Sequence, residues 1–98
     1  MNTFAVDFET YYDKTCSIKT LGTLGYFSHP DFEAYRVSIV GDEGTKFVGD
    51  PRDFDWAKLN GSIILSHNAS FDETLFIYGV KKGWWEDFKW EEWHCTAD

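Results

Sequence analysis

The sequence predicts one small α/β domain with a mixed sheet, in which three antiparallel strands are followed by helix and strand units. Three strand-like runs come first, at residues 3–10, 35–40 and 45–48. The second and third are joined by residues 41–44 (GDEG), a turn composition that favours an antiparallel hairpin. Helical patterns then alternate with short strand-like runs, which is typical of α/β units packed on a sheet.

The first strand carries two carboxylates near its end. In this run (TFAVDFET), apolar and polar side chains alternate as expected for a strand with one buried face. The apolar face holds Phe4, Val6 and Phe8. The opposite face holds Asp7 and Glu9, whose Cα atoms should lie about 7 Å apart.

Short helices are expected in two connections. The long polar connection after the first strand is predicted to hold one short helix around residues 17–27. A second short helix is predicted at residues 51–59, because Asp50 can cap it and Pro51 suits the first helical position. Residues 60–61 (Asn-Gly) would end this helix.

A buried strand and a longer helix follow. Residues 62–66 (SIILS) form an apolar run, as expected for a strand that is buried on both faces. The cap of the next helix is left open between Asn68 and Ser70, and its end between Gly79 and Gly83. The expected apolar stripe of this helix consists of Phe71, Leu75, Phe76 and Val80.

Composition and charge exclude several classes of protein. The 98 residues suffice for one domain and are too few for two. No apolar run approaches the roughly 20 residues that cross a bilayer, and the start lacks the features of a signal peptide. We therefore expect a soluble, cytoplasmic protein with Cys16 and Cys95 as reduced thiols. The net charge of -8 has the wrong sign for binding nucleic acid by phosphate neutralisation alone, so metal ions or another domain would have to supply positive charge.

A second group of polar residues begins where the buried strand ends. Residues 66–72 (SHNASFD) run from this strand into the following helix. Ligands of open α/β sheets gather at the carboxyl ends of strands, so Asn68 and Asp72 lie where a site is expected. Carboxylate pairs such as Asp7 and Glu9 suit Mg²⁺ or Mn²⁺. Taken singly, the strand pair could be an exposed face and Asp72 a first-turn acid that interacts with the helix dipole.

Together the two motifs resemble those of the DEDD 3′–5′ exonucleases, specifically the proofreading domain of bacteriophage family A DNA polymerases. Residues 7–10 (DFET) resemble the first motif, and residues 67–72 (HNASFD) resemble the second. The sequence between them is also similar, at residues 7–13, 17–24 and 30–33. The resemblance covers nearly the whole chain. It implies a ribonuclease H-like fold, a phage-infected bacterial host, and a single partial exonuclease-like domain over residues 1–98.

The resemblance also implies roles for particular residues. The family hydrolyses the 3′ end of DNA with two divalent metal ions, Mg²⁺ or Mn²⁺, held by four carboxylates. By resemblance, the catalytic and metal-binding carboxylates here are Asp7, Glu9 and Asp72. The residues expected beside the terminal nucleotide are Phe8, Thr10 and Asn68. We interpret His67 as structural and Phe71 as core packing.

The third motif of the family is not clearly present. It consists of an Asp that closely follows a Tyr or His general base, and it usually lies far beyond the second motif. His94 and Asp98 have a suitable spacing and could be a compressed version. Alternatively, residues 93–98 (WHCTAD) are the strand and helix start that follow the second motif, with residues 95–96 where the family often has Asp-Thr. Without a general base, activity of this chain by itself is left open.

The last part of the chain is rich in aromatic side chains and is expected to form a further strand within residues 90–95. In a complete domain these side chains would pack under later helices, and in this chain we expect them to be exposed: Trp84, Trp85, Phe88, Trp90 and Trp93. Exposure predicts a protein partner or self-association. The functions that stay open are part of an exonuclease, an inactive short phage protein that binds or inhibits a protein partner, and a stable fragment without activity.

Overall fold

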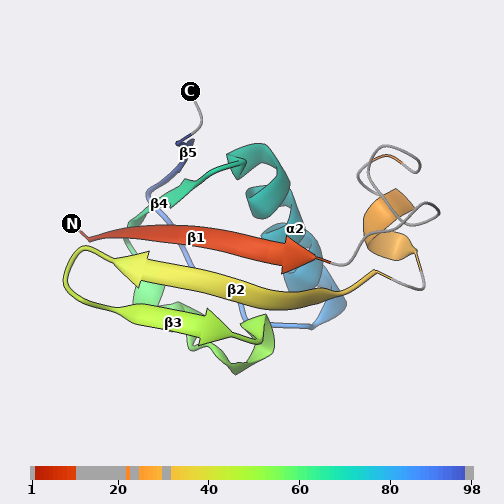
Figure 1. The fold of residues 1–98 in the computed structure, drawn as a ribbon, viewed down its shortest axis with the longest axis horizontal. Coiled ribbons are helices and arrows are strands. Elements are labelled where there is room, and N and C mark those ends of the chain that lie inside the picture. The colour runs from red at the N-terminus through yellow and green to blue at the C-terminus, as the bar shows by residue number, and fades with distance from the viewer. Residues whose placement is uncertain (1, 11–21, 23–24, 30–31, 97–98) are drawn as a thin grey trace.

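The structure is a computed structural model that describes residues 2–10, 22, 25–29 and 32–96. Its described part is an α/β fold built on a five-stranded mixed sheet (Figure 1). The order across the sheet is β3-β2-β1-β4-β5. In chain order, the strands and the long helix are β1 (Thr3–Thr10), β2 (Ala34–Gly41), β3 (Lys46–Gly49), β4 (Ile63–Ser66), α2 (Ala69–Lys82) and β5 (Glu92–Cys95).

The sheet has an antiparallel half and a parallel half. β1 pairs with β2, and β2 with β3, in antiparallel ladders. β1 pairs with β4, and β4 with β5, in parallel ladders. The predicted arrangement of three antiparallel strands followed by helix and strand units is confirmed. In Figure 1, β1 lies in the middle of the sheet and α2 lies behind it.

The core lies on one face of the sheet. Phe4, Val6 and Phe8 are buried, as the alternation in the first strand predicts. The prediction that the run SIILS is buried on both faces was wrong, because Ile63 and Leu65 are only half-buried. Helix α2 packs on the core face of the sheet. Ile63 and Leu65 lie on the other face, so these two side chains keep contact with solvent.

Residues 51–59 form two short turns rather than the one helix predicted. These 3₁₀ turns are η1 (Pro51–Asp53) and η2 (Trp56–Leu59). The helix does not continue because Phe54 has an extended backbone, with φ −86° and ψ 141°. Asp55 then caps the second turn by accepting a backbone N–H with its side chain.

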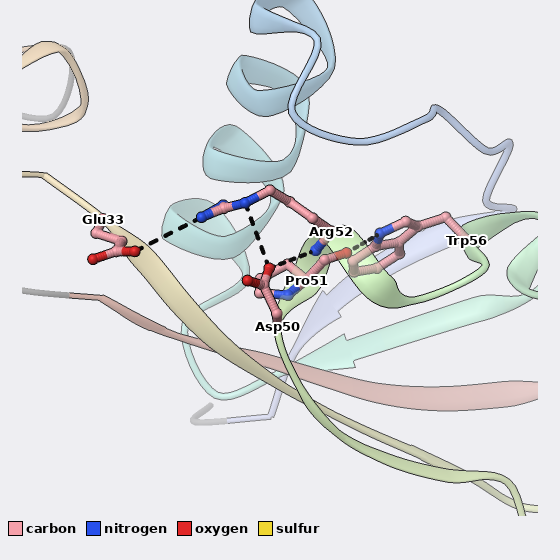
Figure 2. A network of polar contacts seen from close by, with 5 residues as sticks. All are labelled: Glu33, Asp50, Pro51, Arg52 and Trp56. Carbon is pink, nitrogen blue, oxygen red and sulfur yellow. Dashed lines mark hydrogen bonds and ion pairs between the residues drawn. The ribbon is translucent and has the colours of Figure 1, made fainter.

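A small polar network joins the first of these turns to the start of β2 (Figure 2). The carboxylate of Asp50 accepts the N–H of Arg52 at 2.9 Å, so the predicted cap is confirmed. The Arg52 guanidinium lies 3.6 Å from Asp50 and 3.8 Å from Glu33, in exposed ion pairs that contribute little stability. The indole of Trp56 donates to the carbonyl of Pro51 at 3.0 Å, which satisfies the polar atom of a fully buried side chain.

Helix α2 begins and ends at two of the expected residues. The side-chain oxygen of Asn68 accepts the N–H of Phe71 at 3.3 Å, so Asn68 and not Ser70 is the cap. Gly83 ends the helix in the left-handed conformation, with φ 77°. Gly79 remains inside the helix, where its lack of a side chain leaves room for an indole ring.

The aromatic C-terminal segment is part of the core, so the prediction that it is exposed was wrong. Trp85 and Phe88 are only 7% and 4% exposed. Phe88 stacks on Trp56 with ring centroids 5.9 Å apart, and Trp85 stacks on Phe76 at 6.1 Å. These partners come from the chain itself, so no later helices are needed to cover them. The half-buried rings that pack against this core are Trp84, Trp90 and Trp93.

The connection after β1 is described in part. Residues 25–28 are helical, and their aromatic side chains, Tyr26 and Phe27, are buried. Most of the rest of the helix predicted around residues 17–27 lies outside the described residues, as does Cys16. Among the residues that the structure describes, no helix has the length and apolar character to cross a membrane.

Candidate functional site

The parallel strands β1 and β4 stop pairing before β1 ends. Their register runs from Thr3 opposite Ile63 to Ala5 opposite Leu65. β1 continues to Thr10 alongside β2. Backbone groups of β1 beyond Ala5 that face β4 therefore need other partners. The carboxyl ends of parallel strands are where open α/β sheets bind ligands, and the connection from β4 to α2 lies at this edge.

Ser66 joins the strands where their pairing ends. It is 1% exposed, and its hydroxyl donates to the carbonyl of Val6. The same hydroxyl oxygen accepts the indole N–H of Trp93 at 2.9 Å. The Ser66 carbonyl accepts the N–H of Thr96 at 2.8 Å. Ser66, at the end of β4, is thus held from both neighbouring strands.

Asp72 lies in the first turn of α2 and is 4% exposed. Its pKa is raised to about 7, first because burial disfavours the charged carboxylate and second because Asp7 is negatively charged. Hydrogen bonding with the Phe8 backbone acts in the opposite direction. Asp7 and Asp72, which come from distant parts of the chain, therefore lie near each other at this edge of the sheet.

Asp7 is held in place by the connection between β4 and α2. The N–H of His67 donates to Oδ1 of Asp7 at 3.0 Å. The thiol of Cys95, a free cysteine, donates to the carbonyl of His67 at 3.1 Å. His67 therefore supports the site through its backbone, in agreement with a structural role, and its own side chain is exposed.

Glu9 has a different environment. It lies opposite Arg36 in the register of β1 and β2, and its Oε2 is 3.8 Å from the Arg36 Nε. Both side chains are 55% exposed. The structure brings Asp7 and Asp72 together, whereas Glu9 faces a cation of the neighbouring strand.

Asp7 and Asp72 could contact one hard cation, but they do not form a closed metal cage. Within residues 2–10, 22, 25–29 and 32–96, no group of three or more His, Cys, Asp or Glu side chains is placed to hold a metal ion. Mg²⁺, however, is usually bound through only one or two carboxylates together with water and substrate phosphates. Asp7 and Asp72 are the carboxylates at this edge that could contact such an ion, and a cation there would offset the charge that burial disfavours.

Phe8, Thr10 and Asn68, the residues expected near a nucleotide, differ in burial and in their hydrogen bonds. Phe8 is 9% exposed and stacks on Trp56 in the core, so only its backbone faces the carboxylate pair. The hydroxyl of Thr10 accepts a hydrogen bond from Tyr26 at 2.8 Å. Asn68 is exposed, and its side-chain oxygen is used by the helix cap. Contact of these residues with a nucleotide stays a prediction.

The end of the chain supports one of the two interpretations of the third motif. Residues 92–95 form β5, which pairs in parallel with β4, so the residues around His94 are a strand as the second interpretation expects. The imidazole Nε2 of His94 lies 3.2 Å from the carboxylate of Glu92 on the same strand. Asp98 lies outside the described residues.

Sequence reasoning named Ser66 in the second polar group without giving it a role, and it missed Trp93 and Arg36 as residues around the site. Ser66 could have been noticed as a hydroxyl at the end of an apolar run, where a buried polar group needs partners. Trp93 and Arg36 carry no local signal, because their roles follow from pairing between distant strands.

Comparisons of the chain with protein-family models, with curated proteins and with solved structures gave no match. The class that the structure itself defines is an α/β domain with a mixed five-stranded sheet. Its distinguishing feature is a pair of carboxyl groups beside the carboxyl ends of the central parallel strands.

Proposed function

We propose that the chain is part of a metal-dependent nuclease of the DEDD 3′–5′ exonuclease type, from the proofreading domain of a bacteriophage DNA polymerase. The observation that carries the proposal is that Asp7, of the first motif, accepts the N–H of His67, of the second motif, at 3.0 Å and lies near Asp72, so the two motifs that resemble this family lie together. A buried carboxyl beside a second carboxylate is unfavourable for folding, so its presence is better explained by a ligand than by stability.

The sheet supports a ribonuclease H-like fold as part of this proposal. That fold combines three antiparallel strands with parallel helix and strand units, and the described strands follow the same plan. Asp7 lies on the central strand and Asp72 on the helix that follows the next strand across the sheet.

Asp7 and Asp72 would hold a Mg²⁺ or Mn²⁺ ion. Such an ion, when bound, lowers the pKa of a water molecule and stabilises negative charge on a leaving oxygen. The chain's own residues prepare the site: the His67 amide orients Asp7, and burial keeps bulk water from Asp72. The complete family site holds a second ion. For Glu9 to bind it, the Glu9 carboxylate would have to leave its ion pair with Arg36.

The proposed substrate is the 3′ end of a DNA strand. The chain carries a net charge of -8, so a phosphate would be repelled unless a cation compensates. This requirement agrees with a metal at the carboxylate pair. Asn68 and Thr10 are the polar side chains that we expect to contact the terminal nucleotide.

The deciding experiment incubates the purified chain with 5′-labelled single-stranded DNA and Mg²⁺ or Mn²⁺. We expect stepwise loss of 3′ nucleotides that is abolished by chelation and by either Asp7→Ala or Asp72→Asn. Asp53→Asn is the matched control, because Asp53 is an exposed acid on η1. The proposal fails if the wild-type chain leaves DNA intact at high protein concentration, or if Asp7→Ala degrades it equally well.

A second candidate is a protein of this fold that binds a protein partner and has no nuclease activity. It is favoured by the pairing of Glu9 with Arg36, which leaves only two of the three expected carboxylates together. The partner or a second copy would contact the half-buried aromatic rings such as Trp84 and Trp90. Sedimentation at increasing concentration tests the second copy: a constant monomer mass rejects it. DNA degradation that requires Asp7 rejects this candidate function.

A further inference from the structure

We propose that Thr96, which follows β5, is a positioning residue for Asp7 and that it acts through the peptide group between Ser66 and His67. The proposal rests on the proposed function, because it concerns how Asp7 is held for a divalent cation. Its basis is two hydrogen bonds that meet on this one peptide group. The Ser66 carbonyl accepts the N–H of Thr96 at 2.8 Å, and the His67 N–H donates to Oδ1 of Asp7 at 3.0 Å.

The peptide group links the positions of Thr96 and Asp7 because it is rigid. The carbonyl and the N–H of a trans peptide lie in one plane and point in opposite directions. Here the carbonyl faces the end of β5 and the N–H faces Asp7 on β1. The Thr96 hydroxyl lies 3.4 Å from the same Ser66 oxygen and adds a second, longer contact. Loss of the Thr96 contacts would therefore free the plane to rotate and move the N–H away from Asp7.

The strand registers explain why the backbone of β5 provides this support. The ladder between β1 and β4 ends before the chain reaches the peptide between Ser66 and His67. The ladder between β4 and β5 continues to Ser66 opposite Cys95, and the hydrogen bond from Thr96 follows directly. β5 is thus the strand whose backbone holds the end of β4. On the other side, the side chain of Asp7 accepts the N–H at that end.

The two hydrogen bonds also strengthen each other. A donor at the carbonyl polarises a peptide group and makes its N–H a better donor. The acceptor of this N–H is the Asp7 carboxylate, and hydrogen bonds to a charged acceptor are stronger than those between neutral groups. The bond to Oδ1 limits rotation of the Asp7 side chain. A carboxylate that is already oriented loses less conformational entropy when it binds a cation.

The test measures binding of Mn²⁺ alone to the folded chain, by the loss of the free-ion electron paramagnetic resonance signal. Thr96→Pro removes the N–H, and we expect it to weaken Mn²⁺ binding about tenfold, the lower end of the effect of residues that orient metal ligands. Thr96→Ala keeps the N–H and removes only the longer hydroxyl contact, so it should weaken binding less. The matched control is Asn60→Ala, which removes the acceptor of the Lys89 N–H, 2.8 Å away, at the opposite end of β4 and β5. It should leave the Mn²⁺ affinity unchanged even where it lowers the melting temperature.

Hydrogen exchange of the wild-type chain keeps the test decisive if Thr96→Pro does not fold. Coupling between two sites is reciprocal, so a hydrogen bond that strengthens cation binding is itself stabilised by the bound cation to the same extent. We therefore expect saturating Mg²⁺ to slow the exchange of the Thr96 amide proton about tenfold, measured by nuclear magnetic resonance. The control is the amide of Lys89, which donates to Asn60, and its exchange should not change.

The outcomes separate this inference from the proposed function. If Asp7→Ala loses Mn²⁺ binding while folded Thr96→Pro binds as the wild type does, the inference is wrong and the proposed function stands. The same conclusion follows if Mg²⁺ binds without slowing the exchange of the Thr96 amide. Equal weakening by Thr96→Pro and Asn60→Ala would show a general loosening of β4 against β5 and would also overturn the inference. If the wild-type chain does not bind Mn²⁺, or Asp7→Ala binds it equally well, both proposals fail.

Discussion

Two opposing effects act on the pKa of Asp72: the end of the helix favours the charged carboxylate, and burial disfavours it. In the first turn of a helix, the macrodipole favours a negative charge by about 0.3–1 kcal/mol, less than one pKa unit. The pKa of Asp72 nevertheless rises from 3.8 to about 7. Burial and the neighbouring Asp7 therefore outweigh the helix end. Such an environment makes the site sensitive to pH and to cations.

The raised pKa predicts how the stability of the metal-free chain depends on pH. Below about pH 4, Asp72 is protonated in both the folded and the unfolded chain, so its burial carries no penalty. As the pH rises toward 7, the unfolded state loses its proton first, and the free energy of unfolding should fall until the pH exceeds the folded pKa of about 7. Urea unfolding in the presence of a chelator, measured between pH 4.5 and about 8, would reveal this slope.

Asp72→Asn should make the stability less dependent on pH in that range, because the amide does not titrate. Asp53→Asn, which changes an exposed acid, should retain the wild-type slope. An unchanged slope in Asp72→Asn would show that the pKa of Asp72 is not raised by folding.

At the scale of an element, α2 depends on one capping side chain. Asn68→Ala removes the acceptor of the Phe71 N–H and should lower the free energy of unfolding by about 1 kcal/mol. Ser70→Ala is the matched control, because Ser70 lies inside the helix and is exposed. It should change stability by less than about 0.5 kcal/mol. Thermal or urea unfolding compares them, and a larger effect of Ser70→Ala would identify Ser70 as the cap.

For Gly79 in the same helix, we expect a change to Ala to affect stability in the direction opposite to that given by helix propensity. Replacing Gly by Ala inside an exposed helix usually stabilises it by about 1 kcal/mol. A Cβ atom at Gly79 would instead overlap the indole of Trp85, so Gly79→Ala should destabilise the chain by about 1–3 kcal/mol.

The sign of this effect can be checked by making room for the new methyl group. In a chain that already carries Trp85→Leu, Gly79→Ala should become neutral or stabilising, because the overlapping ring is gone. If Gly79→Ala is stabilising in the wild-type chain, the close packing of α2 on Trp85 is refuted.

At the scale of the whole molecule, the aromatic C-terminal segment completes the core that the central strands begin. Phe88 packs against Trp56, Phe76 and Trp90. Phe88→Ala should therefore cost about 3–5 kcal/mol, a large share of the roughly 5–15 kcal/mol that stabilises a domain. Urea unfolding measures this loss. Glu86→Ala, an exposed neighbour, should change stability by less than about 0.5 kcal/mol. A small effect of Phe88→Ala would mean that this segment does not belong to the core.

Much of the fold could be predicted because its signals are local. The alternation in residues 3–10, the turn at residues 41–44 and the Asn68 region each show their structure within a few neighbouring residues. The prediction was wrong at residues 51–59, which form two short turns instead of one helix, with the side chain of Trp56 buried in the core. It failed again for the aromatic segment, whose burial depends on partners far along the chain.

For the candidate site, the sequence by itself determined which residues could form it. Asp7, Glu9 and Asp72 stand out because their types, strand alternation and helix position are local properties. Only the tertiary structure decided that Asp7 and Asp72 lie near each other while Glu9 faces Arg36. The physical reason is that side-chain proximity depends on strand register and on where β1 and β4 separate, and both are set by packing between distant parts of the chain.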